Sequence, residues 1–411
     1  MKEKSSDLIK KQYTEYPYPP IPIGGLEEEV LYSTNYEFVN YLCTGTFKSH
    51  KQTKILDVGC GTGFSTLKLA QQNPEAFITA IDISAVSIEI AKKRLKNAGI
   101  NLNRINFIEA DLMKITDIGE RFDYIVCTGV LHHMESPEIG LNFIKLHLKE
   151  DGLIYLMLYS EYGRFYQSLM RKTINLFQTN KTDIAEGVNI GKEVLKILPD
   201  QHPILSRYRR SYEASLNVIN KEFADSDSQF VDAYINAKER TYNIDELFDF
   251  IEGNGLVFLR FQDEPTWDLN YLLNGNDYLI SKTLNFSMKE KYKIGEIIES
   301  EKNFAFFVSK KDFKKVEIND NDLLKYRVKL SILNKTQTDN QTIEIISPLG
   351  LSVKINIEIY SMYEAIDENK SIKENLELIY KETENVNILK VEEFLLFLRT
   401  MEKNGALLFI K

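Results

Sequence analysis

The chain has 411 residues, which is too long for one ordinary hydrophobic core, so we expect two or three domains. Hydrophobic residues make up 43% and charged residues 27%, a composition typical of globular rather than disordered proteins. The net charge of −9 argues against a large non-specific surface for nucleic acids, and no apolar run approaches the length of a membrane span.

The first 35 residues hold a cluster of tyrosines and prolines, QYTEYPYPPIPIGG. Prolines lack a backbone N–H donor and favour extended backbone, so residues 1–35 are predicted to be an N-terminal arm. Two interpretations of this arm carry equal weight. Either it is solvated, or it packs over a pocket, because Tyr13, Tyr16 and Tyr18 would otherwise expose apolar rings to water.

Apolar runs alternate with helix-like runs from Lys54 onward. Strands are expected at 54–58, 77–83, 104–111, 122–131 and 152–160, and helices at 64–72, 84–99 and 137–148. Because nearly all strand residues are apolar, both faces of the sheet must be covered, which is typical of a parallel sheet in an α/β protein.

The alternation of strands and helices stops at residues 160–240. No clear strand is found there, and basic residues interleave with aromatic ones in helix-like runs. We favour a solvated amphipathic cap over a substrate-facing surface for this insertion. The alternation then resumes with a helix at 241–255, for which Asn243 is the expected N-cap, and with strands at 255–262 and 303–310. Residues 263–300 form a second insertion.

A polar linker at 311–322 precedes a compact C-terminal region, 323–411. Strands are expected at 325–333 and 343–347, followed by two or three helices, the last ending at Gly405, and by a terminal strand. This order favours a small α+β, winged-helix-like module. The expected domains are therefore the arm 1–35, a core domain 36–310 with its helical insertion 160–240, and the C-terminal domain 323–411.

The run from Lys54 to Ala70 is the most informative part of the chain. An apolar strand leads into Gly59-Cys60-Gly61-Thr62-Gly63, and an amphipathic helix follows. Glycines let the backbone turn sharply and pass close to a bulky ligand. The N-terminus of the helix then points its free N–H groups into the turn. This arrangement predicts a nucleotide-like pocket.

Polar residues also follow the other strands, at the edge of an open α/β sheet where ligands bind. Asp57 precedes the glycine turn, and Asp82 ends the second strand at a spacing that suits a carboxylate binding two ribose hydroxyls. Asp111 ends the third strand, where it can accept from an adenine amino group, and Thr128-Gly129 end the fourth. Single acids are often caps or surface charges, but such a series in register is much harder to explain by chance.

These residues resemble the motifs of the class I S-adenosylmethionine-dependent methyltransferases. Residues 57–63 resemble motif I, Asp82 the acid of motif II, and Asp111-Leu112 the adenine-binding pair; FDYIVCTGVLHHM resembles motif IV, and LKEDGLIYLM the strand-5 motif. The resemblance covers 54–160 tightly and 240–310 loosely. A dinucleotide dehydrogenase would show G-x-G-x-x-G, whereas this chain has G-x-G-x-G.

The resemblance implies a seven-stranded, Rossmann-like sheet with strand order 3-2-1-4-5-7-6 and strand 7 antiparallel. It also implies S-adenosyl-L-methionine as the cofactor. The cofactor-binding residues that it indicates are Asp57, Gly59, Cys60, Gly61, Thr62, Gly63, Asp82, Ile83, Asp111, Leu112, Thr128 and Gly129.

Methyl transfer from a sulfonium is an in-line displacement whose leaving group needs no acid, so the enzyme mainly aligns the reactants. A base is needed only when the acceptor carries a proton. His132 and His133 follow the fourth strand and are candidates for substrate binding or proton removal, although a purely structural role is favoured. The pair has no acidic or thiol ligands at metal-binding spacing, so no metal site is expected.

The arm followed by this core also resembles a group of bacterial methyltransferases that includes protein-lysine methyltransferases with a C-terminal accessory domain. In that group an N-terminal tyrosine can close over the cofactor, which makes Tyr13, Tyr16 and Tyr18 candidates for the methyl pocket. Aromatic rings can stabilise a sulfonium or ammonium there. An equally weighted alternative is that these tyrosines only anchor the arm.

The acceptor is expected to be a protein or peptide side chain rather than a small metabolite, since a small acceptor does not require an appended module. A nucleic acid ranks third, because the chain is acidic and lacks an NPPY-type motif for a flipped base. The alternative to an enzyme is a non-catalytic scaffold that binds the cofactor. A homodimer through the C-terminal domain is possible. Cys43, Cys60 and Cys127 are expected to be buried thiols in a reducing cytoplasm.

Overall fold

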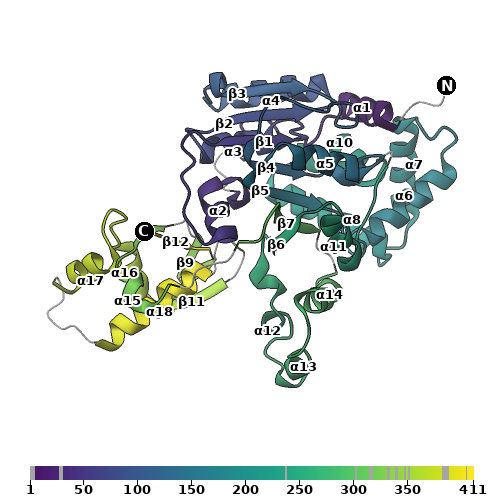
Figure 1. Cartoon of the computed structure of the whole chain (residues 1–411). Helices are drawn as coiled ribbons and strands as arrows, with labels where there is room; N and C mark the ends of the chain where they lie inside the picture. The colour runs from purple at the N-terminus through teal and green to yellow at the C-terminus, as the bar shows by residue number, and fades with distance from the viewer. Residues whose placement is uncertain are drawn as a thin grey trace. The chain divides into compact units, whose positions relative to one another are not determined.

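The computed structural model describes most of the chain and divides it into two compact units (Figure 1). Residues outside the description are 1–4, 27–30, 237, 301–302, 314–317, 331–333, 338–340, 347–348, 350–351, 382–387 and 404. The first unit comprises 1–34, 50–259 and 287–312, and the second unit comprises 35–49, 260–286 and 313–411. The expected domain boundaries differ from this division, because residues 35–49 and 260–286 group with the C-terminal residues instead of with the sheet domain.

A seven-stranded sheet organises the first unit. Its strands are β1 (Lys54–Val58), β2 (Phe77–Asp82), β3 (Ile105–Glu109), β4 (Phe122–Thr128), β5 (Leu148–Leu158), β6 (Val257–Phe261) and β7 (Phe304–Ser309). The order is β3-β2-β1-β4-β5-β7-β6, and β7 runs antiparallel to β5, which confirms the predicted topology. Because β1 pairs in parallel with both β2 and β4, the carboxyl ends of these three strands lie at one edge.

The helices that flank the sheet are α3 (Phe64–Gln72), α4 (Ala85–Asn97), α5 (Pro137–Leu146), α11 (Ile244–Gly253) and α14 (Met288–Ile298). Of these, α4, α11 and α14 begin at a side chain that caps the helix N-terminus. Asn243 caps α11 in a reciprocal capping box with Glu246, as predicted, and Pro137 opens α5 where no backbone donor is needed. Ile55, Leu56 and Val58 of β1 are fully buried, as a sheet covered on both faces requires.

The insertion at 160–240 is helical, which confirms the prediction. It contains α6 (Phe165–Phe177), α7 (Ile184–Ile197), α8 (Pro203–Val218), α9 (Lys221–Ala224) and α10 (Asp227–Tyr234). Its helices pack on a core of their own that includes Met170, Ile174, Val188 and Phe230. The insertion is therefore a small helical layer with its own apolar centre, drawn in teal in Figure 1.

The N-terminal arm begins with a helix, α1 (Ser5–Glu15), which proline-based reasoning did not predict. The prolines lie beyond its end, so they limit only the following segment. Figure 1 shows α1 in purple close to α10, and Tyr13 of α1 is hydrogen-bonded to Asp232 of α10. Of the two interpretations of the arm, the structure supports the packed one.

The second unit contains two small sheets and several helices. Its elements are α2 (Tyr36–Thr44), α12 (Leu269–Leu272), α13 (Asp277–Lys282), α15 (Asp320–Leu323), β8 (Arg327–Leu330), β9 (Asn334–Gln337), β10 (Thr342–Ile346), β11 (Ser352–Asn356), α16 (Ile357–Glu364), α17 (Ile372–Lys381), α18 (Ile388–Lys403) and β12 (Leu407–Ile410). Strands β11, β10 and β9 form one antiparallel sheet, and β12 pairs with β8 in another. The strands β9 and β11 were not predicted, and a winged-helix relationship stays a prediction. Residues 314–317 of the expected linker lie outside the described residues.

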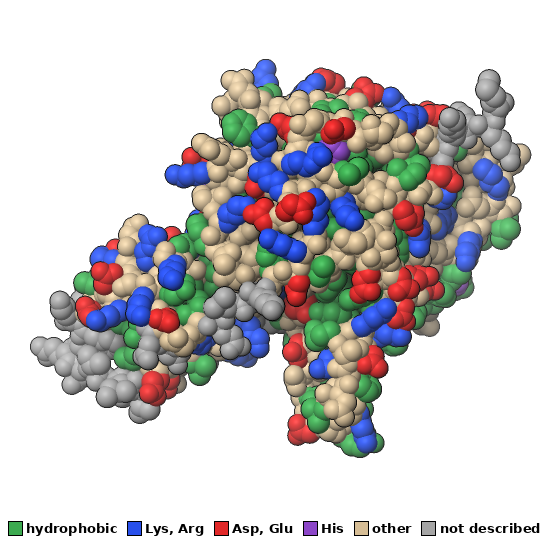
Figure 2. Space-filling view, in the orientation of Figure 1, with side chains coloured by type: hydrophobic (Ala, Val, Ile, Leu, Met, Phe, Trp, Pro, Cys, Tyr) green, Lys and Arg blue, Asp and Glu red, His purple; other side chains and the backbone are tan. Residues whose placement is uncertain are grey.

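Charged side chains of both signs are interspersed over the face of the first unit drawn in Figure 2. This face therefore presents mixed charge instead of a field of one sign. In the described parts of the chain, no helix combines the length and the apolar composition that a membrane span requires.

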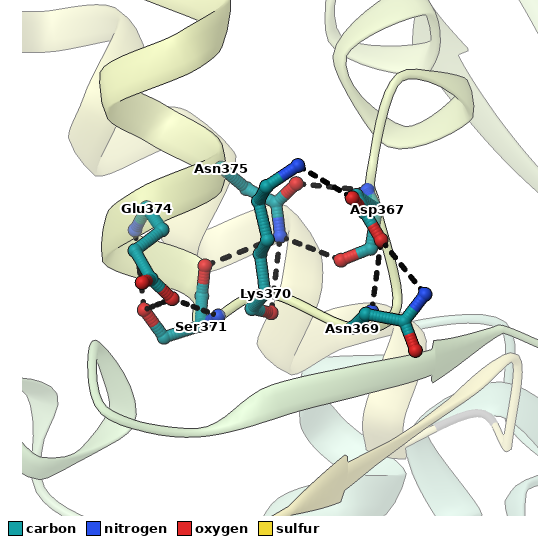
Figure 3. Close-up of polar contacts among 6 residues, drawn as sticks. All are labelled: Asp367, Asn369, Lys370, Ser371, Glu374 and Asn375. Atoms are coloured by element: carbon teal, nitrogen blue, oxygen red, sulfur yellow. Dashed lines mark hydrogen bonds and ion pairs between the residues drawn. The ribbon is translucent and has the colours of Figure 1, made fainter.

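A polar network holds the turn between α16 and α17 in the second unit (Figure 3). Asn375 is buried; its side-chain oxygen accepts from the backbone N–H of Asp367 at 2.8 Å, and its amide donates to the carbonyl oxygens of Asp367, Lys370 and Ser371 at 3.0–3.2 Å. Ser371 and Glu374 cap the start of α17 reciprocally. One buried amide thus satisfies four backbone groups of this turn.

Replacing Asn375 with leucine is expected to destabilise the second unit by about 2 kcal/mol, because buried backbone groups would lose their partners. Denaturant unfolding and hydrogen exchange of residues 367–376 measure this effect. Glu377→Gln on the exposed side of α17 is the control and is expected to change little. Equal stability of the two variants would contradict the role assigned to Asn375.

Candidate functional site

A cavity of about 420 Å³ lies in the first unit, where the strands β1, β2 and β4 end. The predicted site residues that line it are Tyr13, Tyr18, Gly59, Cys60, Gly61, Asp82, Ile83, Asp111, Leu112, Thr128, Gly129 and His133. Five other predicted residues, Asp57, Thr62, Gly63, His132 and Tyr16, are not part of its wall. Residues of α1 and of the insertion, among them Ile9, Phe223 and Asp232, complete the wall and were not predicted.

The glycine turn is shaped by the protein segments that press against it. Gly59 and Gly61 have φ values of +72° and +51°, which side-chain-bearing residues rarely adopt. A Cβ at Gly59 would lie 2.2 Å from the Val130 side chain, and one at Gly61 would lie 2.3 Å from the carbonyl oxygen of Tyr18. Parts of the chain itself therefore already require glycine at these positions, and the predicted close approach of a ligand stays a prediction.

The arm is hydrogen-bonded to this turn through Thr62. Its backbone N–H donates to the carbonyl oxygen of Tyr18 at 3.1 Å, and its hydroxyl donates to that of Pro19 at 2.6 Å. Thr62 is therefore turned away from the cavity and holds the arm in place. This attachment positions Tyr18 in the cavity wall.

Asp82 joins the glycine turn to the end of β2. One carboxylate oxygen accepts from the backbone N–H of Gly61 and the other from that of Ser84, both at 2.8 Å. Burial raises the pKa of Asp82, and the backbone donors oppose that shift by stabilising the charged form. The carboxylate lies in the cavity wall, at the position for which the sequence predicted contact with ribose hydroxyls.

Asp111 and Leu112 follow β3 and also line the cavity. One oxygen of Asp111 accepts from the backbone N–H of Met113 at 2.9 Å, and the other lies 3.0 Å from the ammonium of Lys114. Leu112 is 9% exposed and adds an apolar surface beside the carboxylate. A carboxylate beside an apolar wall suits a flat ring that carries an amino group.

Asp57 lies behind the glycine turn, outside the cavity wall. Its carboxylate accepts from the hydroxyls of Ser65 and Thr66, at 2.7 and 2.6 Å, at the start of α3. Burial raises the pKa of Asp57 to about 6, although both hydroxyl donors lower it. The observed contacts link β1 to α3, and direct contact with a cofactor stays a prediction.

The two histidines occupy different environments after β4. His133 lines the cavity, with Nδ1 at 3.0 Å from the carbonyl oxygen of Lys238 and Nε2 at 3.3 Å from the side-chain nitrogen of Asn236. Burial lowers its pKa, so the neutral ring donates through Nδ1 and accepts through Nε2. His132 is fully buried outside the cavity wall and stacks on Tyr159 at a centroid distance of 3.7 Å.

An unpredicted group of polar residues borders the cavity where the insertion meets the arm. The hydroxyl of Tyr13 donates to Asp232 of α10 at 3.2 Å, and Tyr159 lies in the same wall. The guanidinium of Arg164 lies 4.0 Å from the centroid of the Tyr159 ring and pairs with Glu239 at 2.6 Å. The sequence signal for Asp232 was a charged residue in the apolar stripe of an amphipathic helix.

This cavity fits an adenosine-bearing cofactor by the chemistry of its wall. The Asp82 and Asp111 carboxylates are acceptors at two neighbouring strand ends, which matches a ligand with hydroxyl and amino donors. Ile83, Leu112 and Met113 supply apolar surface beside them. A volume of about 420 Å³ lies within the range of about 300–1,000 Å³ that is usual for ligand pockets.

Comparisons with known proteins agree with this fit. Residues 49–202 match a family model described as a methyltransferase domain. A Synechococcus sp. protein, itself described as uncharacterized, is 34% identical over 327 residues, 79% of this chain and 76% of that protein. A ubiquinone biosynthesis O-methyltransferase of Glaesserella parasuis is 31% identical over 120 residues, 28% of this chain and 50% of that enzyme.

A solved structure shares the fold over most of the chain. PKMT2 from Rickettsia typhi, in complex with AdoHcy, is similar with a TM-score of 0.63 and 17% identity, over 96% of this chain and 77% of that one. At this identity the likeness concerns the fold alone.

Replacing Gly61 with valine is expected to push the Tyr18 carbonyl, and with it the arm, away from the glycine turn. Because Tyr18 lines the cavity, binding of S-adenosylhomocysteine should weaken by at least about tenfold, a loss of roughly 1.4 kcal/mol. Isothermal titration calorimetry measures this affinity.

Gly253→Ala is the matched control, since no heavy atom lies within 4 Å of the Cβ it would add. It should bind like the wild type. A Gly61→Val protein that binds as tightly as the control would contradict the placement of the cofactor against this turn.

Proposed function

The chain belongs to the class I S-adenosylmethionine-dependent methyltransferases, and on this premise we propose that its acceptor is a side chain of a protein or peptide. Its cofactor is S-adenosylmethionine. When bound, the cofactor supplies a methyl group on a positively charged sulfur, which a nucleophile can displace without acid catalysis. The work left to the protein is to bind, align and shield the reactants.

The residues of the cavity wall divide this work between two regions. We propose that Asp82 and Asp111 bind the hydroxyl and amino donors of the cofactor, with Ile83 and Leu112 against its apolar parts. We further propose that Tyr13, Tyr18 and Tyr159, with Phe223 from the insertion, form the wall around the acceptor. These rings exclude water from the reacting groups and offer aromatic surface to a cation.

The size and closure of the cavity carry the proposal. One space of about 420 Å³ has to hold both the cofactor and the reacting part of the acceptor. Helix α1 and the insertion wall this space on the side of Asp232. A slender side chain fits such a space better than a bulky ring system, while the rest of a protein acceptor stays outside.

The second unit supports a macromolecular acceptor independently. It has a core of its own, with Phe394, Leu398 and Met401 fully buried. Such a unit is unnecessary for binding a small acceptor. The arm's resemblance to bacterial protein-lysine methyltransferases points in the same direction.

A small-molecule acceptor is the second candidate. The observation that favours it is the apolar character of several wall residues, such as Met113, Met134 and Met157, which can adapt to an apolar metabolite. The similar enzyme of Glaesserella parasuis is named for ubiquinone biosynthesis. A cofactor-binding scaffold without turnover is the third candidate.

Transfer of labelled methyl groups in a lysate tests the proposal. The purified chain and labelled S-adenosylmethionine are added to a lysate of cells that lack the chain, and the label is separated into protein, nucleic-acid and small-molecule fractions. We expect the label in the protein fraction, with Gly61→Val giving only background and Gly253→Ala giving the wild-type yield.

Label confined to small molecules would contradict a protein acceptor. Binding of S-adenosylmethionine without transfer to any fraction would instead favour the scaffold.

A further inference from the structure

We propose that Asp232 binds the acceptor as an amine, so that the methylated atom is a nitrogen. This inference rests on the methyl transfer proposed above and identifies the acceptor atom and the residue that recognises it. It assigns a chemical role to the helical insertion, which supplies the carboxylate.

Asp232 is buried in an unusual place for a carboxylate. It is 8% exposed and lines the cavity, and its neighbours Phe230, Val231 and Tyr234 on α10 pack into the apolar centre of the insertion. A buried carboxylate is costly unless a donor or a cation compensates it. Its position therefore requires a partner within reach.

The hydrogen-bond donors around Asp232 do not use all the acceptor sites of its carboxylate. Its hydrogen bond from Tyr13 spans 3.2 Å, longer than the roughly 2.5–3.0 Å usual for a hydroxyl donor. In the described part of the chain, no other hydrogen bond reaches the Asp232 side chain. Burial raises the pKa of Asp232; a charged His133 would oppose that shift, as Arg164 does.

Arg164, whose charge acts on Asp232, is already paired with another acid. Arg164 donates to both carboxylate oxygens of Glu239, at 2.6 and 3.3 Å, and to the carbonyl oxygen of Ala233 at 2.9 Å. Arg171 also approaches Glu239, at 3.3 Å. The ion pair of Arg164 is thus with Glu239, and among the residues that the structure describes no cationic side chain forms an ion pair with Asp232.

His133 does not supply that charge either. Both of its ring nitrogens are within hydrogen-bond distance of Lys238 and Asn236, and burial lowers its pKa, so the ring is neutral. The ionisable groups around Asp232 are therefore the phenols of Tyr13, Tyr18 and Tyr159, a neutral imidazole and an arginine bound to Glu239. An ammonium entering the cavity is the complementary partner.

An amine also suits the chemistry of the transfer. An ammonium has no lone pair, so one N–H bond must break, with the proton forming an O–H bond on Asp232 and the electron pair remaining on nitrogen. Burial raises the pKa of a carboxyl and lowers that of an amine. The difference between the two pKa values therefore shrinks, which makes the proton transfer less unfavourable. A carboxylate acceptor would be repelled by the negative charge of Asp232. An alcohol is too weak an acid to be deprotonated by a carboxylate.

Binding of a model amine tests the inference without turnover. The full chain is saturated with S-adenosylhomocysteine, and n-butylammonium chloride is titrated while saturation-transfer NMR reports contact; 1-butanol is the neutral probe. We expect n-butylammonium to bind at least about tenfold more tightly than 1-butanol, as recognition by a buried carboxylate predicts. Asp232→Asn, which keeps the side-chain shape, should abolish this preference.

Asp227→Asn is the matched control on the same helix, because the Asp227 carboxylate is exposed and paired with Lys192. It should keep the preference for n-butylammonium, and both variants should bind S-adenosylhomocysteine as the wild type does, which shows that they are folded. Equal binding of the two probes by the wild type, or an unchanged preference in Asp232→Asn, would overturn the proposal.

The chemistry of the labelled product separates this inference from the proposed function. Label on protein that survives mild alkali and appears as N-methylated amino acids after hydrolysis supports both. Label on protein that alkali releases is a methyl ester, which overturns the amine while the protein acceptor stands. Label on a small amine overturns the protein acceptor and leaves the role of Asp232 standing.

Discussion

The cavity depends on one buried side chain, Arg94 of α4, which joins the N-terminal arm to the glycine turn. Its guanidinium is fully buried and donates to the carbonyl oxygens of Thr62 at 2.9 Å, Pro22 at 3.1 Å and Ile21 at 2.5 Å. The planar fork of arginine can reach three carbonyls at fixed angles, which a lysine ammonium cannot do with the same geometry. The glycine turn and the arm are thereby held as one assembly.

The properties of the site follow from this assembly. Because the arm lies against the turn, Gly61 has no room for a side chain, and Tyr13 and Tyr18 become part of the cavity wall. The arm also brings Tyr13 to Asp232, so that the end of the cavity is built from segments more than two hundred residues apart in sequence. This arrangement supports our proposal that the arm and the insertion determine the acceptor, while the sheet edge binds the cofactor.

Local patterns predicted those parts of the fold that depend on local physics. Alternating apolar strands and capped helices identified the parallel sheet, and the motif resemblance supplied its strand order. Asp57 shows the limit of this reasoning: it stands at a strand end like Asp82, yet hydroxyls of α3 hold its carboxylate outside the cavity. Other features depend on contacts between distant segments, which periodicity and spacing cannot predict. They are the packing of helix α1, the hydrogen bond between Tyr13 and Asp232, and the discontinuous second unit.

The most direct test of this account is the affinity of Arg94→Leu for S-adenosylmethionine, measured by calorimetry. If Arg94 holds the arm against the glycine turn, the variant should bind at least about tenfold more weakly than the wild type, and the arm should become open to limited proteolysis. Lys92→Leu, on the surface of the same helix, should match the wild type in both respects. Unchanged affinity together with an arm that still resists protease in Arg94→Leu would contradict the account.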